Sequence, residues 1–284
     1  MSLALSATER DALVTRHKTA IDGSLRNRLM TIAVVAGLVG LFVYGVTTLE
    51  VSFWRILNGF GNLGTFVVLM LPPDPGSFAR ATLFVKALFE TIAIAFLGTI
   101  LAAVIAFPLG FIAARNVIAN KVVHFLARRS LDTVRGVDAL IWALIWVNVV
   151  GLGPFAGMLA IMTSDIGAFG KLYSEAIEAA DRKPVEGVTS MGGGKLHEIR
   201  FGMIPQVLPV IASQVLYYIE SNTRSSTIIG IVGAGGIGLY LAETIRTLEW
   251  QQVSFLILLI LAAVTAIDFI SSKLRFAIIG KRAI

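Results

Sequence analysis

The sequence predicts an all-α, polytopic membrane protein with about six transmembrane helices. Of its 284 residues, 56% are hydrophobic and 15% are charged, and the mean hydropathy is +0.81. Soluble domains carry charge on about a quarter of their residues, so this chain is far more apolar than a soluble protein. Several uncharged runs also approach the roughly 20 residues that a helix needs to cross a bilayer.

The first predicted span follows a polar segment. Residues 1–28 are too long and too acidic for the charged start of a cleaved signal peptide, so we expect a retained cytoplasmic N-terminal segment. Residues 29–49 carry no charge and are predicted to be the first transmembrane helix. Residues 50–90 contain several glycines and the cluster PPDP, which break helices, so they predict an extracytoplasmic or interfacial connection.

Residues 91–275 are expected to form the transmembrane core. Its first run, residues 91–114, would be about 36 Å long as a helix. Less regular runs follow at residues 137–150, 154–173, 204–219 and 253–270. Together with residues 29–49, these five runs give a count of six crossings, and residues 276–284 are expected to be a cytoplasmic tail.

The basic residues predict the orientation of the chain in the membrane. Of the 24 lysines and arginines, 19 fall in the N-terminal segment, the second connection, the loop before residue 205 with its approach from Lys171, and the C-terminal end from Lys273. Because cytoplasmic loops are enriched in lysine and arginine, both termini and that loop are expected in the cytoplasm of a multi-pass plasma-membrane protein. The net charge of +6 follows from this topology and gives no case for nucleic-acid binding.

No residue pattern in the chain supports catalysis. Cysteine is absent, and the three histidines are scattered without the spacing of a metal site. A GxGxxG pattern begins at Gly233, but no acid follows about 20 residues later, so a dinucleotide site is excluded. Gly194-Lys195 lacks both flanks of an ATP-binding phosphate loop. We therefore expect no catalytic residue, no metal and no cofactor bound by this chain.

One polar run interrupts the apolar second half of the chain. It reads EAADRKPVEGVTSMGGGKLHEIRFGMIP over residues 178–205. Pro184 suits the first turn of a helix, the three glycines from Gly192 allow a sharp reversal, and Pro205 separates the run from the next span. The sequence predicts two short helices around a glycine turn, whose apolar residues either dock into a partner or lie on lipid headgroups: Val188, Met191, Leu196 and Ile199.

The spacing of this loop resembles the cytoplasmic EAA loop of permeases in ABC importers. The literal EAA at Glu178 is out of register, because Pro184 stands where the pattern has glycine. Glu186, Gly192 and Pro205 fall in register, whereas Gly187-Val188, Gly202 and Ile204 depart from it. The resemblance implies a coupling loop over residues 181–205 that meets an ATPase through Glu186, Gly187, Met191, Gly192, Leu196 and Pro205.

Further segments resemble the permease subunit of phosphonate-type ABC importers over roughly residues 80–275. These segments are LIWALIWVNVVGLGPFAGMLA, KLYSEAIEA, PQVLP, GIVGAGGIG and WQQVSFLILLILAAVTAIDFIS. One departure is the stretch from Arg135 to Asp138, where that family usually has a proline-containing helix start. The resemblance implies a type I-like importer fold and a transporter subunit that is not itself an enzyme.

The resemblance also implies partners and a substrate class. It implies a second permease, either another copy or a paralogue, two ATPase subunits that hold ATP and magnesium, and an extracytoplasmic binding protein. The expected cargo is phosphonate or a related phosphorus oxyanion such as phosphate or phosphite. Alternatives are a permease for another small solute such as methionine, a secondary transporter and, with no residue pattern in support, a membrane enzyme.

Two features of the core remain candidate functional sites. The segment LYYIESNTRSSTIIG places Glu220 and Arg224 four residues apart, at a depth counted from Ile204 as the outer half of the membrane. They either pair only with each other on one helix or line a translocation pathway with Asn222 and Ser225, near Thr223 and Ser226.

The second feature is the glycine-rich segment GIVGAGGIG. It predicts irregular backbone that lines a cavity or lets helices approach closely, because non-helical backbone at membrane depth must be buried in protein or wet. Its glycines are Gly230, Gly233, Gly235, Gly236 and Gly238.

Overall fold

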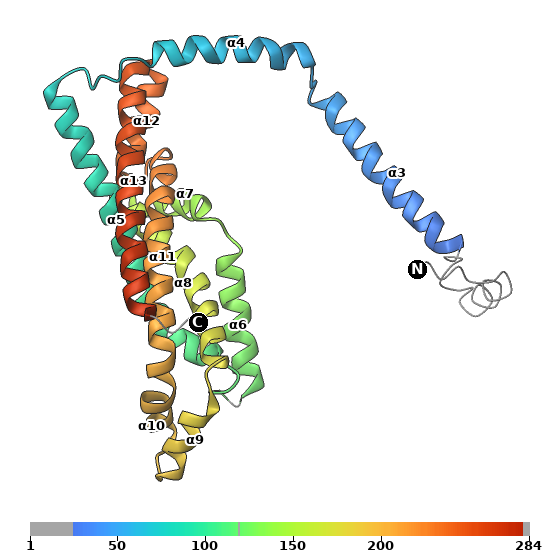
Figure 1. Ribbon diagram of the computed structural model, residues 1–284, viewed down its shortest axis with the longest axis vertical. Coiled ribbons are helices and arrows are strands. Elements are labelled where there is room, and N and C mark those ends of the chain that lie inside the picture. The colour runs from blue at the N-terminus through green and yellow to red at the C-terminus, as the bar shows by residue number, and fades with distance from the viewer. Residues whose placement is uncertain (1–24, 119, 281–284) are drawn as a thin grey trace, which may run out of the picture. The chain divides into compact units, whose positions relative to one another are not determined.

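The computed structural model describes residues 25–118 and 120–280, and every regular element in these ranges is a helix (Figure 1). The chain divides into two units, residues 1–65 and 66–284. The elements are α3 (Leu25–Thr48), α4 (Phe53–Leu69), α5 (Phe78–Ala113), α6 (Lys121–Arg135), α7 (Ala139–Val150), α8 (Pro154–Glu178), α9 (Arg182–Ser190), α10 (Lys195–His197), the π-helix η1 (Glu198–Met203), α11 (Ile204–Gly230), α12 (Ile237–Arg246) and α13 (Trp250–Ile279).

The first unit contains α3 and most of α4. The apolar helix α3 matches the predicted first span, and its side chains are exposed along nearly its whole length. The connection after it differs from the prediction, because α4 continues as a helix through Gly59, Gly61 and Gly64. An isolated glycine weakens a helix but does not end it, whereas the Pro72-Pro73 pair lies just beyond the end of α4.

The second unit is a helical bundle centred on α5 and α8. Helix α5 begins at Phe78, with Ser77 as its N-cap, so the core starts before the predicted boundary at residue 91. Small residues of α5 let α8 approach closely. A Cβ added to Gly98 would lie 2.9 Å from Ile161, and one added to Gly110 would lie 2.7 Å from the Cβ of Tyr173.

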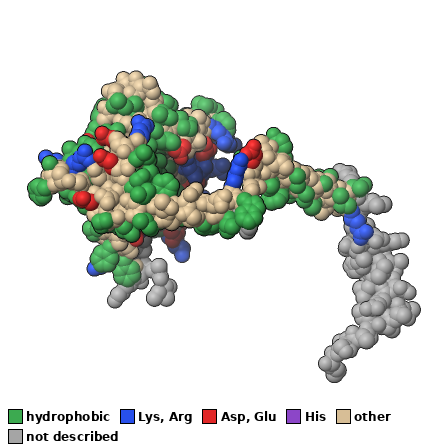
Figure 2. Space-filling model, turned by 90° about the horizontal axis from the view of Figure 1, so that it is seen from above, with side chains coloured by type: hydrophobic (Ala, Val, Ile, Leu, Met, Phe, Trp, Pro, Cys, Tyr) green, Lys and Arg blue, Asp and Glu red, His purple; other side chains and the backbone are tan. Residues whose placement is uncertain are grey.

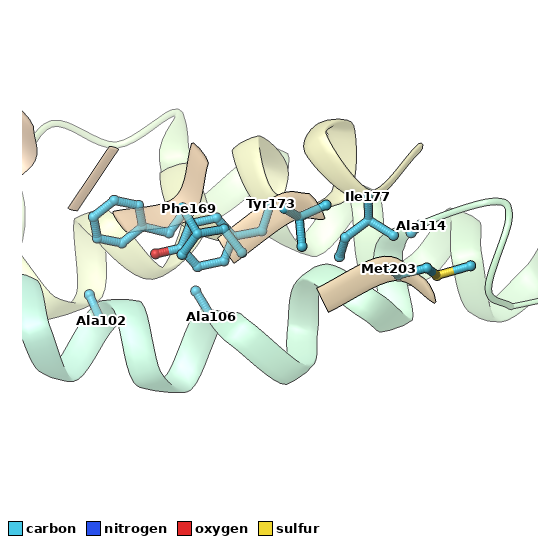
Figure 3. Packing of buried hydrophobic residues seen from close by; sticks show 9 residues of the cluster. Ala102, Ala106, Ala114, Phe169, Tyr173, Ile177 and Met203 are labelled. Carbon is cyan, nitrogen blue, oxygen red and sulfur yellow. The ribbon is translucent and has the colours of Figure 1, made fainter. Parts of the chain in front are cut away.

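The buried core continues between α5, α8 and α11. Ala102 and Ala106 of α5 face the rings of Phe169 and Tyr173 on α8 (Figure 3). These two rings stack with their centroids 5.3 Å apart, and Tyr218 of α11 packs against Phe169 at 4.6 Å. The two alanines leave the room that the large rings occupy.

Judged by length and composition, fewer helices qualify as membrane spans than the six that the sequence predicts. Four described helices are long and apolar enough to cross a membrane, or five if the bent pair α6 and α7 forms one span. Helix α7 alone is only about 18 Å long, which is too short to cross. Helix α8 has 25 residues but carries Asp165, Lys171 and Glu175, so it does not qualify by composition.

The bend between α6 and α7 occurs at the segment that departs from the family pattern. The two helices meet at 86°. Gly136 ends α6, and the Asp138 side chain then caps α7 by accepting a hydrogen bond from the Leu140 backbone N–H at 2.8 Å. An aspartate N-cap thus starts α7 without a proline.

Exposed apolar side chains are spread over the surface of the described residues (Figure 2). They include Phe89 and Val104 on α5, and Leu261 and Phe269 on α13. Such a surface suits a lipid environment, where apolar side chains need no cover from other protein elements.

The glycine-rich segment forms the tight connection from α11 to α12. Gly233, Gly235 and Gly236 have φ between +73° and +93°, and glycine adopts such angles without the steric cost of a Cβ. A Cβ on Gly230 would lie 2.9 Å from the Cα of Gly238, so the two helices nearly touch there. Of the two predicted roles, close helix approach is the one that the structure shows.

Helix α5 caps the start of α12 across this connection. Helix α12 has no side-chain N-cap of its own. Instead, the Thr91 hydroxyl accepts a hydrogen bond from the Ile237 N–H at 2.7 Å, and Glu90 accepts one from the Gly236 N–H at 3.3 Å. These contacts satisfy N–H groups that a helix start otherwise leaves unpaired.

The close approach at Gly238 gives a test of the packing. We expect Gly238→Ala to destabilise the protein, because the added methyl group would overlap the carbonyl oxygen of Thr227. Overpacking of this kind costs about 1–3 kcal/mol, which corresponds to several degrees of thermal stability. The measurement is the temperature at which detergent-solubilised protein leaves the monodisperse peak in size-exclusion chromatography. Gly37→Ala is the control, since its Cβ would meet nothing within 4 Å; equal behaviour of the two variants would contradict the predicted packing.

Candidate functional site

The polar loop before α11 folds into two short helices, as the sequence predicts. Helix α9 begins at Arg182, where the Asp181 carboxylate accepts a hydrogen bond from the Lys183 N–H at 3.1 Å. Pro184 lies in the first turn of α9. Of the three consecutive glycines, only Gly192 has a positive φ, +82°, so this residue alone supplies the left-handed turn.

Hydrogen bonds hold the two ends of the loop together. The Gln206 side chain at the start of α11 accepts from the Asp181 N–H at 2.9 Å and donates to the Asp181 carbonyl at 3.1 Å. Across the turn, the Thr189 hydroxyl contacts Glu198 at 3.1 Å. A Cβ on Gly202 would lie 3.0 Å from the Cα of Val185, so α9 and η1 lie backbone to backbone. The loop is therefore a braced unit attached directly to α11.

The turn of this unit presents apolar side chains outward. Met191 is 89% exposed and Leu196 is 79% exposed, whereas Val188 and Ile199 are half-buried. Glu186 is also exposed. Of the four apolar residues predicted to face a partner or the headgroups, two are thus directed outward and two are half-buried. The turn of the loop lies at the end of the bundle, beyond α8 and α11 (Figure 1).

Pro205 does not separate the loop from the next span, in contrast to the prediction. Residues 195–230 form one continuous run of helix in which η1 leads into α11, and Pro205 is the second residue of α11. Proline lacks an N–H and its ring crowds the preceding turn, and a π-helical turn is one way to accommodate this within a helix. A movement of the loop would consequently be passed on to α11 without a flexible joint.

Glu220 of α11 binds two arginines. Its side chain is 8% exposed, and one carboxylate oxygen accepts from Arg275 of α13 at 3.0 Å while the other accepts from Arg224 at 3.4 Å. Nearby, the Ser271 hydroxyl donates to the Leu216 carbonyl at 3.0 Å. The pair with Arg275 joins α11 to α13 and is the shorter of the two contacts.

These contacts show where Glu220 lies along the bundle. Arg275 lies close to the end of α13 at Ile279, so Glu220 is level with the C-terminal part of α13. The depth of Glu220 in the outer half of the membrane stays a prediction.

Asn222 faces away from Arg224 and belongs to a buried polar junction. Its side-chain amide uses both hydrogens, one to the hydroxyl of Thr99 on α5 at 2.8 Å and one to the carboxylate of Asp165 on α8. All three side chains are buried. Thr99 in turn donates to its own helix at the Ala95 carbonyl. Asn222 therefore joins three helices and does not group with Arg224 as the sequence analysis expected.

Within the second unit, Arg224 is the most exposed polar residue of α11. Its side chain is 53% exposed, on a face of α11 shared with half-buried Ser221 and Ser225. Thr223 and Ser226 are buried, and their hydroxyls donate to backbone carbonyls of their own helix. Of the hydrogen-bond donors predicted to line a translocation pathway with Arg224, only Ser225 shares its face of α11.

The geometry offers a transmission element and a polar helix face. Among residues 25–118 and 120–280, no three histidine, aspartate or glutamate side chains come together as metal ligands. A braced loop continuous with a long helix can pass on movement, and a half-exposed arginine can attract an anion.

Residues 106–279 match the protein family described as "Binding-protein-dependent transport system inner membrane component". This match covers more than half of the chain. The chain belongs to this family. It is therefore a multi-pass membrane component of a transport system, with the all-helical fold expected of such permeases.

Relatives and solved structures agree with this membership. The chain is 41% identical over 233 residues to a putative phosphite transport system permease protein, HtxC, of Stutzerimonas stutzeri, covering 82% of both chains. It is 48% identical over 118 residues to a putative cryptic phosphonate transport system permease protein, PhnE2, of Escherichia coli, covering 42% of this chain and 97% of the relative. An inward-facing structure of the MetNI methionine ABC transporter superposes with a TM-score of 0.62 at 19% identity, covering 71% of this chain and 99% of that one, and shares the fold.

The sequence analysis missed three residues that organise the site. Asp165 was visible only as an interruption of a span, although a carboxylate within a membrane helix is itself a signal for a buried partner. Arg275 was assigned to basic residues near the tail, and Gln206 carried no signal. Their partners lie 25 or more positions away along the chain, and spacing rules for single helices cannot find such pairs.

The polar junction predicts a specific loss of stability. We expect Asn222→Ala to destabilise the protein by about 1–3 kcal/mol, because the change leaves the buried Asp165 carboxylate without its amide partner. The measurement is the thermal transition of the purified protein. Asn148→Ala is the control, because that exposed side chain bonds only to the Leu144 carbonyl of its own helix. A transition that drops equally in both variants, or in neither, would rule out the junction as a stabilising contact.

Proposed function

We propose that the chain is the permease subunit of an ATP-driven importer that carries phosphonate or a related phosphorus oxyanion. Membership of the transport family supports the permease role, and the phosphite and phosphonate permeases among the relatives support the substrate class. The observation that carries the coupling mechanism is the braced loop whose exposed tip continues into α11. The likeness to a methionine transporter extends to the fold alone and gives no support to methionine as cargo.

The importer is proposed to contain two permeases and two ATPase subunits, served by a separate binding protein. Two permeases, either two copies or a copy and a paralogue, form the membrane part. Two ATPase subunits, which hold ATP and magnesium, meet the loop, and an extracytoplasmic binding protein delivers the substrate on the other side. Both termini and residues 181–205 lie in the cytoplasm in this arrangement, as the basic residues favour.

Coupling is proposed to run from the loop through α11 into the bundle. The tip, with Met191 and Leu196, inserts into the ATPase, and Gln206 ties the start of α9 to α11. Helix α11 is in turn fixed to α5 and α8 by Asn222 and to α13 by Glu220. Because packed helices move as rigid bodies, ATP-driven closure of the ATPases shifts these helices together.

The translocation pathway is proposed to be lined by the uncovered face of α11, which is the face that carries Ser221, Arg224 and Ser225. A charged side chain in a membrane helix is costly toward lipid, so a half-exposed arginine belongs against water or a partner subunit. The longer contact between Arg224 and Glu220 leaves guanidinium donors for an anion, while Glu220 keeps its shorter contact to Arg275. Weak retention suits a conduit, since the substrate must leave again.

The loop assignment predicts that Glu186→Lys uncouples transport. The change reverses a charge on the exposed surface of α9, and losing one strong interface contact weakens binding by about 2 kcal/mol or more. We expect at least about a tenfold loss of substrate-stimulated ATP hydrolysis in the reconstituted importer, with normal membrane insertion. The measurements are ATPase co-purification and hydrolysis in liposomes with the binding protein present.

Glu50→Lys is the matched control for Glu186→Lys. Glu50 is also an exposed glutamate, and its side chain pairs with Arg55 at 2.7 Å. This variant should keep full coupling. Full ATPase assembly and hydrolysis in Glu186→Lys would refute the docking role of α9.

The pathway assignment predicts different effects for the two arginines that contact Glu220. Arg224→Gln removes a cation from the uncovered face. One charge-assisted hydrogen bond is worth about 1.5–3 kcal/mol. Because losing this bond weakens the contact with the anion, uptake of radiolabelled phosphonate should slow by about tenfold or more. Thermal stability should change little, because the contact is long and half-exposed. Arg275→Gln should mainly lower thermal stability, since Arg275 pairs with the buried Glu220 carboxylate at 3.0 Å.

A double variant separates the two roles of Arg224. If Arg224 only pairs with Glu220, combining Arg224→Gln with Glu220→Gln should restore uptake relative to either single change. The structure requires the same comparison for Arg275→Gln with Glu220→Gln, because Glu220 serves both arginines. Uptake normalised to inserted protein decides the matter: recovery in the first pair would refute a pathway role for Arg224.

A further inference from the structure

A basic pocket lies where α5 connects to α6, apart from the loop and from the uncovered face of α11. Its volume is about 450 Å³, and it is lined by Arg115, Ile118, Lys121, His124 and Phe125. A water molecule occupies about 30 Å³ in the liquid, so the pocket has room for a polar headgroup. None of these residues takes part in the proposed coupling or translocation.

The two cations of the pocket keep donors for a ligand. Among the described residues, neither Arg115 nor Lys121 forms an ion pair. The nearby acids are already engaged, because Arg128 contacts Glu178 at 3.0 Å and Glu175 at 3.7 Å. Two uncompensated positive charges that line one cavity favour an anion.

A buried ring nitrogen of His124 also lacks a partner. The Arg115 Nε donates to His124 Nε2 at 3.3 Å, so the proton of a neutral ring is on Nδ1. Nδ1 is buried and has no hydrogen-bond partner in the described parts of the chain. His124, which lines the pocket beside the two cations, therefore also carries an unsatisfied ring donor.

The connection that forms the pocket is fixed to the end of α8. The Arg115 N–H donates to the Glu178 carboxylate at 2.9 Å, and the Asn116 side chain donates to the Ile177 carbonyl at 2.8 Å. These bonds hold the backbone of Arg115 independently of its side chain. The pocket is thus preorganised, which lowers the entropic cost of binding a ligand.

The surroundings of the pocket match an amphiphile at the membrane boundary. The apolar helix α5 ends at Ala113, and Arg115 follows two residues later, at the depth where lipid headgroups begin. On α6, exposed Val122, Phe125 and Leu126 have the spacing of one helix face. A cationic pocket is thus continuous with an apolar strip, because Phe125 belongs to both.

We propose that this pocket binds the phosphate headgroup of an anionic phospholipid, whose acyl chains lie along the apolar face of α6. Basic pockets between transmembrane helices on the cytoplasmic side are suited to such headgroups. Free inorganic phosphate shares the oxyanion chemistry but gains nothing from Ile118 and Phe125, so the lipid fits the whole lining. The proposal does not depend on which solute the importer carries.

The test measures lipid binding to the complete importer. Detergent-purified permease with its ATPase is titrated with phosphatidylglycerol and with phosphatidylcholine, and bound lipid is counted by native mass spectrometry. We expect the double variant Arg115→Gln/Lys121→Gln to bind phosphatidylglycerol about 25-fold more weakly, at about fivefold for each lost charge. Binding of phosphatidylcholine should not change.

Two variants separate the pocket from general charge and folding effects. The charge-preserving swap Arg115→Lys/Lys121→Arg should retain most phosphatidylglycerol binding if the site is electrostatic. Lys273→Gln removes one exposed lysine near the end of α13, outside the pocket, and should leave this binding unchanged. Phosphatidylglycerol binding that is equal in the wild type and in the glutamine double variant would overturn the proposal.

A competition arm distinguishes the lipid from free phosphate. Excess inorganic phosphate is added to the lipid-loaded complex, with chloride at the same ionic strength as the reference. We expect phosphatidylglycerol to stay bound, because its acyl chains contribute contacts that the free ion lacks. Selective displacement by phosphate would overturn the lipid assignment and make the pocket a site for the free oxyanion.

Discussion

The close approach of α5 and α8 is the constraint on which the rest of the bundle depends. Apolar helices gain little by leaving lipid for one another, so close van der Waals contact between small residues decides which helices associate. Gly98 and Gly110 of α5 provide this contact, since a side chain at either would meet Ile161 or Tyr173 of α8. Once these two helices are fixed, α8 presents Asp165 to α11 and presents Glu178 to the connection after α5.

Polar contacts then set the rotation of α11 and α13 against this pair. A buried amide or carboxylate without a partner costs several kcal/mol in an apolar environment, so only one rotation of each helix is acceptable. Asn222 satisfies that condition for α11 through Thr99 and Asp165, and Glu220 does so for α13 through Arg275. The same rotation leaves Arg224 on the uncovered face. Stability and the proposed pathway thus follow from one packing arrangement.

Helix α11 serves both proposed functions because it is continuous with the loop. Its first turn holds Gln206, its middle holds Glu220 and Asn222, and its last residue enters the glycine connection to α12. A displacement at the tip of the loop therefore reaches every helix that α11 contacts. The basic pocket between α5 and α6 lies outside this route, where Arg115 is held by the end of α8.

The sequence by itself determined the features that depend on local composition and backbone preference. These are the membrane class, the two short helices around Gly192 and the irregular glycine connection, because hydrophobicity, proline and glycine act within a few residues. Tertiary structure alone decided the bend between α6 and α7, the pairing of Glu220 with Arg275 and the burial of Asn222. The sequence shows which residues are polar, but the residue that each one meets depends on how packing rotates helices that are far apart in the chain.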